Sequence, residues 1–227
     1  MGWDMKSFDK AFVTGCDANT EWQLEWFFKN FKKHNKNVPI VFADFGVSQE
    51  MRSWVNIAGF AEIVEIPKQR VNGWFLKPKT LKQVQAKHLC WIDTDCHVQA
   101  NVEDIWDHCE PNKLCMAVDR PWTKRTGEVW HNSGVMAIVD KPIILDKWIQ
   151  ECIKRGNAIA TGQGDQEILH YMLASPLGRL QHISDLPNIY NWLRLDFIDG
   201  LDSSEKRIVH WTGEKGNNKI RKLIYNE

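Results

Sequence analysis

The sequence has no long hydrophobic run and no excess of charge of one sign. No stretch approaches the ~18 apolar residues that a membrane-spanning helix needs, so no transmembrane segment is expected. The 29 Lys and Arg balance 29 Asp and Glu, which argues against nucleic acid or an anionic membrane as a partner held by bulk charge. Residues 1–9 contain Asp4 and no apolar core, unlike a signal peptide. We expect a soluble, cytoplasmic protein.

The sequence also lacks Cys-x-x-Cys pairs, internal repeats and low-complexity linkers. The missing pairs argue against a structural zinc site and a thioredoxin-like motif, so the cysteines are expected to be reduced and mostly buried. At ~100–200 residues per domain, residues 1–227 are expected to form one domain. The six cysteines are Cys16, Cys90, Cys96, Cys109, Cys115 and Cys152.

Apolar runs and helical patterns alternate over the first ~65 residues, which predicts parallel strands covered by helices. Strands are expected at residues 11–13, 38–42 and 61–66. A first helix should follow Thr20, which forms a possible capping box with Gln23, and a second should span residues 48–57. The expected fold class is therefore α/β.

The remainder of the chain continues this pattern. Helical composition marks residues 80–87 and 165–173, and Pro142 suits the first turn of a helix that runs to about residue 153. A polar segment, residues 119–131, separates two further strands. Strands are expected at residues 89–92, 114–118, 135–139 and 208–209.

Ligands bind at the carboxyl ends of strands in open α/β sheets, so polar residues after apolar runs are candidate site residues. Asp17 follows the first strand, and Asp93 and Asp95 follow the strand at 89–92. Residues i and i+2 of an extended segment point to one side, so both carboxylates can face one divalent ion. About one Asp-x-Asp is expected by chance in this composition, and the position at a strand end is what favours a site.

Asn132-Ser133-Gly134 precedes the strand at 135–139 and offers an amide, a hydroxyl and a close backbone approach to a hydroxylated ligand. A simple turn would have the same composition.

Gly164-Asp165-Gln166 opens a helix with Asp165 at the expected N-cap, so Asp165 is either a cap or a reactive carboxylate. His210 follows a short strand and would complete a metal site, although a lone histidine is more often structural. Lys215, a few residues later, would neutralise a phosphate.

The order of these motifs resembles that of the GT-A-fold glycosyltransferases, in particular the retaining family 8 enzymes of the glycogenin and lipopolysaccharide galactosyltransferase type. The series runs from Asp17-x-Asn19 through Lys77, Asp-x-Asp, Asn-Ser-Gly-Val and Gly-Asp-Gln to a late His-x-x-Gly, and covers residues 12–219. The resemblance implies a single GT-A-type, Rossmann-like domain with a mostly parallel central sheet and helices on both faces.

The resemblance also implies roles for the nucleotide and metal residues. Asp17 and Asn19 would lie near the base and ribose, and Lys77 near the ribose or diphosphate. Asp93 and Asp95 would bind the ion and the donor diphosphate. His210 would be the third metal ligand, and an imidazole favours Mn²⁺ over Mg²⁺.

The remaining positions would bind the diphosphate and the sugars. Gly213 and Lys215 belong to the diphosphate site, although the lysine stands one place early, so that either Lys215 or Lys219 would make the contact. Asp165 and Gln166 would lie at the anomeric carbon, as the catalytic residues. Asn132, Ser133, Gly134 and Trp211 would bind the sugar substrates.

The sequence has 12 Trp and only 3 Tyr, and indole faces either fill a core or stack on sugars. Four tryptophans fall on apolar faces and are expected in the core: Trp22, Trp26, Trp91 and Trp148. Four lie beside the motifs or in the polar segment, where stacking on an acceptor sugar is expected: Trp74, Trp122, Trp130 and Trp211.

The function expected from these features is metal-dependent transfer of a sugar, with UDP as the expected nucleotide, to a glycan or other hydroxyl acceptor with retained anomeric configuration. If the configuration is inverted, Asp165 becomes the general base. A uronic acid donor would require a further cation, for which Arg120, Lys124 and Arg125 are candidates.

Three other classes fit less well. A non-catalytic, Trp-rich carbohydrate-binding module would need neither nucleotide nor metal. An Asp-x-Asp phosphotransferase would need Thr or Val where His97 stands, and a dinucleotide-binding fingerprint at Gly162-Gln163-Gly164 lacks its third glycine.

Overall fold

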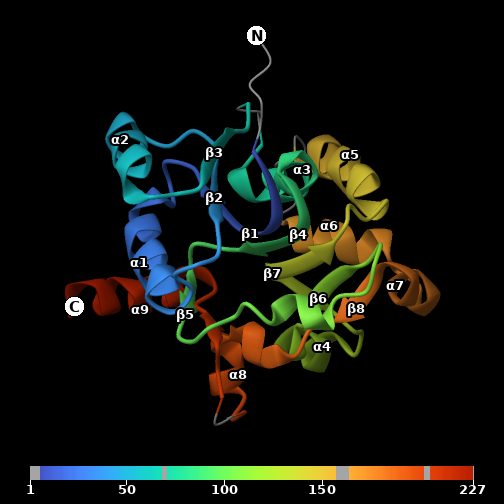
Figure 1. The fold of residues 1–227 in the computed structure, drawn as a ribbon. Coiled ribbons are helices and arrows are strands. Elements are labelled where there is room, and N and C mark those ends of the chain that lie inside the picture. Colours follow the sequence, from blue (N-terminus) through green and yellow to red (C-terminus); the bar gives the residue numbers. More distant parts are fainter. Residues whose placement is uncertain (1–5, 68–70, 157–163, 202–204, 227) are drawn as a thin grey trace.

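The computed structural model describes residues 6–67, 71–156, 164–201 and 205–226, so Gly162 and Gln163 lie outside the described residues. Within these ranges a seven-stranded sheet has the order β3-β2-β1-β4-β7-β6-β8 (Figure 1). Its strands are β1 (Ser7–Cys16), β2 (Ile40–Asp44), β3 (Glu62–Glu65), β4 (Gln85–Ile92), β6 (Leu114–Val118), β7 (His131–Val139) and β8 (Ile183–Asp185).

The strand pairing is mostly parallel. β1 pairs in parallel with β2 and β4, β2 with β3, and β6 with β8, whereas β7 runs antiparallel to both β4 and β6. The α/β fold with a mostly parallel central sheet is therefore as the sequence predicts.

A second, three-stranded sheet brings the end of the chain to the Asp-x-Asp segment. It consists of β5 (Cys96–Val98), β10 (Ile208–His210) and β9 (Trp192–Leu193). The antiparallel register of β10 and β5 sets His210 opposite Cys96, and the Trp211 backbone N–H donates to the Asp95 carbonyl (3.0 Å). His210 thus lies beside a motif more than a hundred positions earlier in the sequence.

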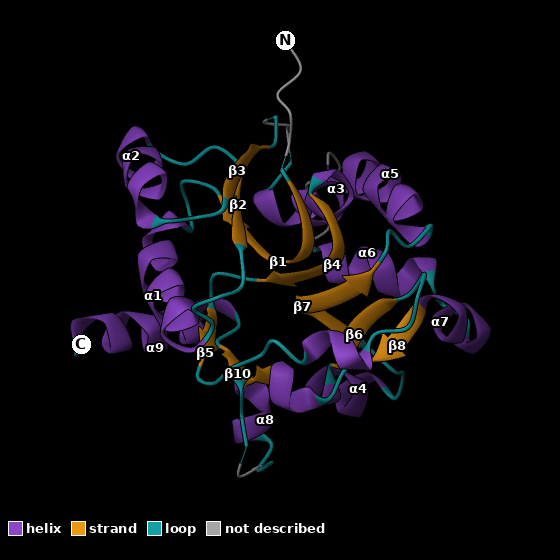
Figure 2. Cartoon of the chain, viewed as in Figure 1, coloured by secondary structure: helices purple, strands orange, loops and turns teal. Residues whose placement is uncertain are grey.

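Helices cover both faces of the main sheet (Figure 2). Because strand side chains alternate, Ala11 and Val13 of β1 enter one core, whereas Phe12 enters the other. The first core is completed by α3 (Lys77–Gln83), α5 (Ile144–Gly156) and α6 (Asp165–Met172), and the second by α1 (Leu24–His34), the 3₁₀ helix η3 (Ile105–His108) and α9 (Gly213–Tyr225).

Shorter elements complete the described chain. They are η1 (Glu21–Gln23), α2 (Gln49–Ala58), η2 (Gly73–Leu76), α4 (Arg120–Thr126), α7 (Pro176–His182), η5 (Asn188–Tyr190) and α8 (Arg194–Ile198). No described helix has the length and apolar character needed to cross a bilayer.

Two expected boundaries were wrong because strand pairing overrides local composition. The helix expected at residues 80–87 ends at Gln83, since β4 already pairs with β1 from Gln85. The strand expected at 135–139 begins at His131, so Asn132, Ser133 and Gly134 are strand residues and not a turn.

Three expected helix starts also differ. The Thr20 side chain makes no capping bond to the helix, and its hydroxyl lies 3.4 Å from Asp17 Oδ1 instead. Gly164, not Asp165, is the N-cap of α6, because Glu167 Oε2 accepts the Gly164 N–H (2.8 Å). Pro142 lies just before α5, which begins at Ile144.

The tryptophans expected in the core are there. Trp26, Trp91 and Trp148 are buried, and Trp22 is partly buried against the second core.

We expect Phe12→Ala to lower the free energy of unfolding by about 3–5 kcal/mol, because a buried aromatic ring leaves a cavity. Its ring lies 4.9 Å from Phe31 and 4.8 Å from Trp106, measured between ring centroids. Urea unfolding measures the change. Ile57→Ala is the control, since that side chain is 83% exposed and its loss should cost no more than about 0.5 kcal/mol. Equal costs for the two variants would contradict this description of the core.

Candidate active site

Two adjoining cavities open where β1 and β4 end. The first, of about 380 Å³, is lined by residues that follow these two strands, and the second, of about 280 Å³, by residues of β7 and α6. Trp74, Lys77 and Asp93 line both. The two cavities therefore meet at one buried cation.

The first cavity contains the residues expected to bind the base and ribose. Asp17 and Asn19 both line it, and the Asp17 carboxylate accepts the backbone N–H of Asn19 (3.0 Å) and its side-chain amide (3.3 Å). The ring of Phe45, which was not predicted, also lines this cavity. Thr94 and Asp95 complete the wall next to Asp93.

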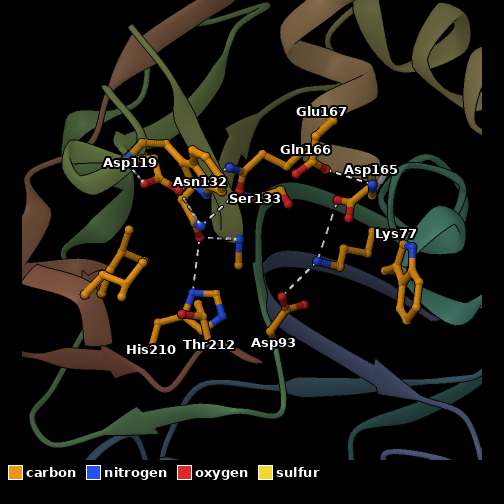
Figure 3. Close-up of a pocket in the computed structure, with 16 residues that line it drawn as sticks. Lys77, Asp93, Asp119, Asn132, Ser133, Asp165, Gln166, Glu167, His210 and Thr212 are labelled. Atoms are coloured by element: carbon orange, nitrogen blue, oxygen red, sulfur yellow. Dashed lines mark hydrogen bonds and ion pairs between the residues drawn. The ribbon is translucent and has the colours of Figure 1, made fainter. Parts of the chain in front are cut away.

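Lys77 stands at the junction of the two cavities, at the first position of α3 (Figure 3). Its Nζ donates to Asp93 Oδ2 (2.8 Å) and lies 3.6 Å from Asp165 Oδ2. Burial disfavours the charged ammonium, but the carboxylates of Asp165 and Asp93 outweigh it and raise the pKa of Lys77. Lys77 is therefore a permanent buried cation.

The two aspartates of the Asp-x-Asp motif have different partners. Asp93 accepts hydrogen bonds from Lys77 and from Trp91 Nε1 (2.6 Å). Asp95 Oδ1 instead lies 3.1 Å from His210 Nε2. Both carboxylates still line the first cavity, as the i, i+2 spacing predicts.

His210 has the surroundings of a metal ligand. Its Nδ1 lies 3.1 Å from the amide oxygens of both Asn132 and Asn191, so Nδ1 carries the proton and Nε2 faces Asp95. Burial favours the neutral imidazole, but the charges of Asp95 and Asp93 outweigh it and raise the pKa of His210. A divalent cation at Nε2 would take the place of the proton that the charged imidazole carries on Nε2. Carboxylate oxygens and one imidazole nitrogen are a donor set that fits Mn²⁺ or Mg²⁺.

A group of three possible metal ligands comprises Asp95, His210 and Cys96. Cys96 is fully buried, and burial raises the pKa of its thiol well above the ordinary value. The thiol is therefore protonated near neutral pH and makes a poor ligand for a hard ion. Of this group, Asp95 and His210 are therefore the residues that could hold a hard divalent ion.

Gly134 is required by the packing of the imidazole. A Cβ built at this position would lie 2.0 Å from His210 Cε1. Any side chain here would displace His210, which explains a glycine inside a strand.

Amide side chains and one carboxylate form a network along the wall of the second cavity (Figure 3). Gln166 Oε1 accepts from Asn132 Nδ2 (2.9 Å) and the Ser133 backbone N–H (3.3 Å). Asp119 Oδ2 in turn accepts from Gln166 Nε2 (3.1 Å) and Asn132 Nδ2 (3.2 Å). Both polar ends of the Gln166 side chain are thus engaged within the protein.

Asp119 and Asn191 were missed by the sequence reasoning. Asp119 follows the strand at 114–118, the same type of position that identified Asp93, and it is followed by a helix with Pro121 near its start. The sequence therefore contained a signal for Asp119, namely a polar residue directly after an apolar strand. Asn191 follows a 3₁₀ turn, and no local pattern distinguishes it.

Asp165 is the buried carboxylate that faces both Lys77 and the second cavity. It is 4% exposed, and its Oδ2 makes no hydrogen bond within the described structure. Burial raises its pKa to about 6, against the opposing effect of Lys77. A buried acceptor atom beside a cavity that has an ion pair but no hydrogen bond is suited to accept a ligand hydroxyl.

Three predicted site residues line neither cavity. Gly213 begins α9 with a φ of 71°, and Lys215 is exposed on that helix. The Trp211 ring stacks on Phe197, with centroids 5.9 Å apart, and Lys219 Nζ lies 5.8 Å from the Trp211 ring. Their roles remain predictions.

Two of the four tryptophans expected to stack on sugars are well placed for it. Trp74 and Trp122 line the second cavity and are 44% and 45% exposed. Trp130 is instead buried, with its ring stacked on His170 at 3.6 Å between centroids, which leaves no face for a sugar.

The sequence matches no protein-family model and no curated protein. Solved structures do match. The galactosyltransferase LgtC, in complex with donor and acceptor sugar analogues, superposes with a TM-score of 0.71 at 14% identity over 95% of each chain. The fold is that of a GT-A glycosyltransferase.

Two further matches are larger proteins. GlyE, a glycosyltransferase of Streptococcus pneumoniae TIGR4, has a TM-score of 0.66 at 20% identity, covering 90% of this chain and 55% of its own. WbbM, a bifunctional glycosyltransferase, has a TM-score of 0.62 at 14% identity, covering 93% of this chain and 46% of its own. The resemblance inferred from the order of motifs is thus confirmed at the level of the fold.

We expect Asp165→Asn to raise the free energy of unfolding near pH 7 by up to about 3 kcal/mol. Asp165 has a pKa of about 6 in the folded protein, above its value in the unfolded chain, so its ionisation destabilises the folded protein as pH rises between the two values. An asparagine amide does not ionise and has no such effect. The gain should therefore vanish near pH 4. Urea unfolding in EDTA measures it.

Asp146→Asn is the control for this measurement. Its carboxylate is mostly exposed and pairs with Lys82 (3.0 Å), so the change should stay within about 0.5 kcal/mol at either pH. An Asp165→Asn variant less stable than the wild type near pH 7 would show that Lys77 more than compensates the buried charge, contrary to our assignment.

Proposed function

We propose that this protein transfers a sugar from a nucleotide diphosphate sugar, with UDP as the nucleotide, to a hydroxyl group of an acceptor. The observation that carries the proposal is the pair of cavities joined at Lys77 and Asp93, on a glycosyltransferase fold. One cavity suits the nucleotide and the other the sugar. The junction then lies where the diphosphate must be.

The junction already holds one cation and can hold a second. Lys77 is buried and charged, and Asp95, His210 and Asp93 would hold a divalent ion, with Mn²⁺ favoured by the imidazole. Such an ion would offset the negative charge that develops on the departing diphosphate. Lys77 does the same from its fixed position, with no reorganisation during the reaction.

In the proposed reaction the bond between the anomeric carbon and the diphosphate oxygen breaks, and the acceptor oxygen forms the new bond. If configuration is retained, the acceptor proton passes to the leaving diphosphate. If it is inverted, Asp165 takes the proton as general base.

Of the two expected catalytic residues, we assign the contact with the transferred sugar to Asp165. Its Oδ2 makes no hydrogen bond and has only the 3.6 Å ion pair with Lys77, whereas the oxygen and the nitrogen of the Gln166 amide both bond within the protein. Gln166 then acts by holding the wall of the sugar cavity. The NMR coupling constant of the anomeric proton in the product distinguishes retention from inversion.

The charges around the second cavity favour a neutral sugar. Lys77, the only Lys or Arg among its described lining residues, already pairs with Asp93 and Asp165. Arg120 pairs with Asp196 (2.8 Å) and Arg125 with Asp199 (3.1 Å), and neither lines the cavity, nor does Lys124. The cations considered for a uronic acid are therefore not at the site.

We expect the protein, with Mn²⁺ and a UDP-hexose, to release UDP, and the Asp95→Ala variant to lose metal-dependent UDP binding while keeping its fold. Calorimetric titration with UDP and a UDP-release assay measure the two effects. Cys96→Ala is the matched control, because its buried thiol is not expected to bind the ion. Unaltered UDP binding in Asp95→Ala would contradict the metal site, and failure to bind any nucleotide would favour a carbohydrate-binding module.

Among donors, we expect kcat/KM for UDP-glucuronate to be at least about tenfold below that for the best of UDP-glucose, UDP-galactose and UDP-N-acetylglucosamine. The carboxylates that line the second cavity would repel the carboxylate of the glucuronate, and no free cation among its described lining residues would offset them. A panel of initial rates tests this. A preference for UDP-glucuronate would reject the charge argument.

A further inference from the structure

Trp122 is a partly exposed indole at the second cavity. The residue is on α4, its side chain is 45% exposed, and it lines this cavity but not the first. Trp74 is similarly exposed but lines both cavities, so it stands beside the donor. Trp122 is thus the exposed indole on the side away from the nucleotide.

The position of Trp122 is fixed through Asp119. Asp119 Oδ1 accepts the backbone N–H of Trp122 (3.0 Å), and its Oδ2 accepts from Asn132 and Gln166. One buried carboxylate therefore ties the start of α4 to the amides of the sugar cavity.

The indole ring of Trp122 also packs near a second tryptophan that is itself held in place. Its centroid lies 6.2 Å from that of Trp130, which stacks on His170, and His170 Nε2 lies 3.0 Å from Glu128 Oε2. A preformed platform of this kind loses little side-chain freedom when a ligand binds.

Apolar and polar groups alternate around Trp122 in a way that suits a pyranose. The indole and Leu195 offer apolar surface, while Asp119 and Glu167 line the same cavity with carboxylate oxygens. A pyranose has an apolar C–H face edged by hydroxyl donors. An indole can stack on the C–H face, and carboxylates can accept hydrogen bonds from the hydroxyls.

We propose that Trp122 is the stacking platform of the acceptor site and that the acceptor is a carbohydrate with a neutral pyranose at its reacting end. The proposal rests on the proposed transferase function, whose acceptor it narrows from any hydroxyl compound to a glycan. It assigns to Trp122 a specificity role in acceptor binding, in the cavity that also receives the transferred sugar, and none in nucleotide binding.

Saturation-transfer NMR tests the proposal without turnover. The protein, saturated with UDP and diamagnetic Mg²⁺, is mixed with methyl hexopyranosides, lactose, maltose and cellobiose, and separately with a Ser- and Thr-containing peptide. We expect ring C–H protons of at least one carbohydrate to receive saturation. Trp122→Gln should reduce that signal at least about fivefold and Trp122→Phe should retain part of it, because a phenyl ring keeps an aromatic face.

Tyr171→Ala is the matched control. Tyr171 is 51% exposed, its ring centroid also lies 6.2 Å from that of Trp130, and it does not line the cavity. If the carbohydrate signal falls because the packing of Trp130 is disturbed, it should fall in both variants. If it falls because the stacking platform is lost, it should fall only in Trp122→Gln.

Three results would overturn the proposal: no carbohydrate receives saturation, Trp122→Gln retains the signal, or only the peptide binds. The proposed function is scored separately, on the wild-type protein, by its affinity for UDP and by its slow, acceptor-free release of UDP. Loss of the carbohydrate signal with intact UDP binding therefore concerns the acceptor site alone.

Discussion

The structure depends on one buried cation, Lys77, held between two carboxylates that come from different parts of the chain. Asp93 directly follows β4 and Asp165 begins α6, so a single ammonium joins α3, the end of a central strand and the helix that lines the second cavity. A buried charge is tolerated only when it is paired, and here burial, helped by the charge of Asp93 and opposed by that of Lys77, leaves Asp165 with a raised pKa. The same imbalance makes the junction a place where a second cation would be stabilised.

A second carboxylate, Asp119, organises the opposite wall. It binds Asn132 and Gln166 with one oxygen and the start of α4 with the other. Because both ends of the Gln166 amide bond within this network, Asp165 is the residue that we propose to contact the transferred sugar. In this proposal a supporting side chain and a reactive one are adjacent in sequence.

Much of this could be predicted from the sequence, because the signals are local. Alternating strands and helices indicated the parallel sheet, and the rule that ligands bind after strands identified Asp17, Asp93 and Asp95. The errors occurred where tertiary pairing overrides local preference. The extension of β7 to His131 turned an expected loop into a buried strand, and Glu167 capped α6 so that Asp165 could face the cavity.

The sequence by itself determined the order of the motifs, the zero net charge and the residue types able to bind an ion or a diphosphate. Only the tertiary structure decided their partners. His210 meets Asp95 because β10 pairs with β5, a contact between segments that have no local relation. The surplus of tryptophan was likewise visible at once, but burial separated Trp130, which stacks on His170, from Trp122, which is exposed at the cavity. Residue type defines which interactions are possible, and long-range packing selects among them, because burial and distance are properties of the folded chain.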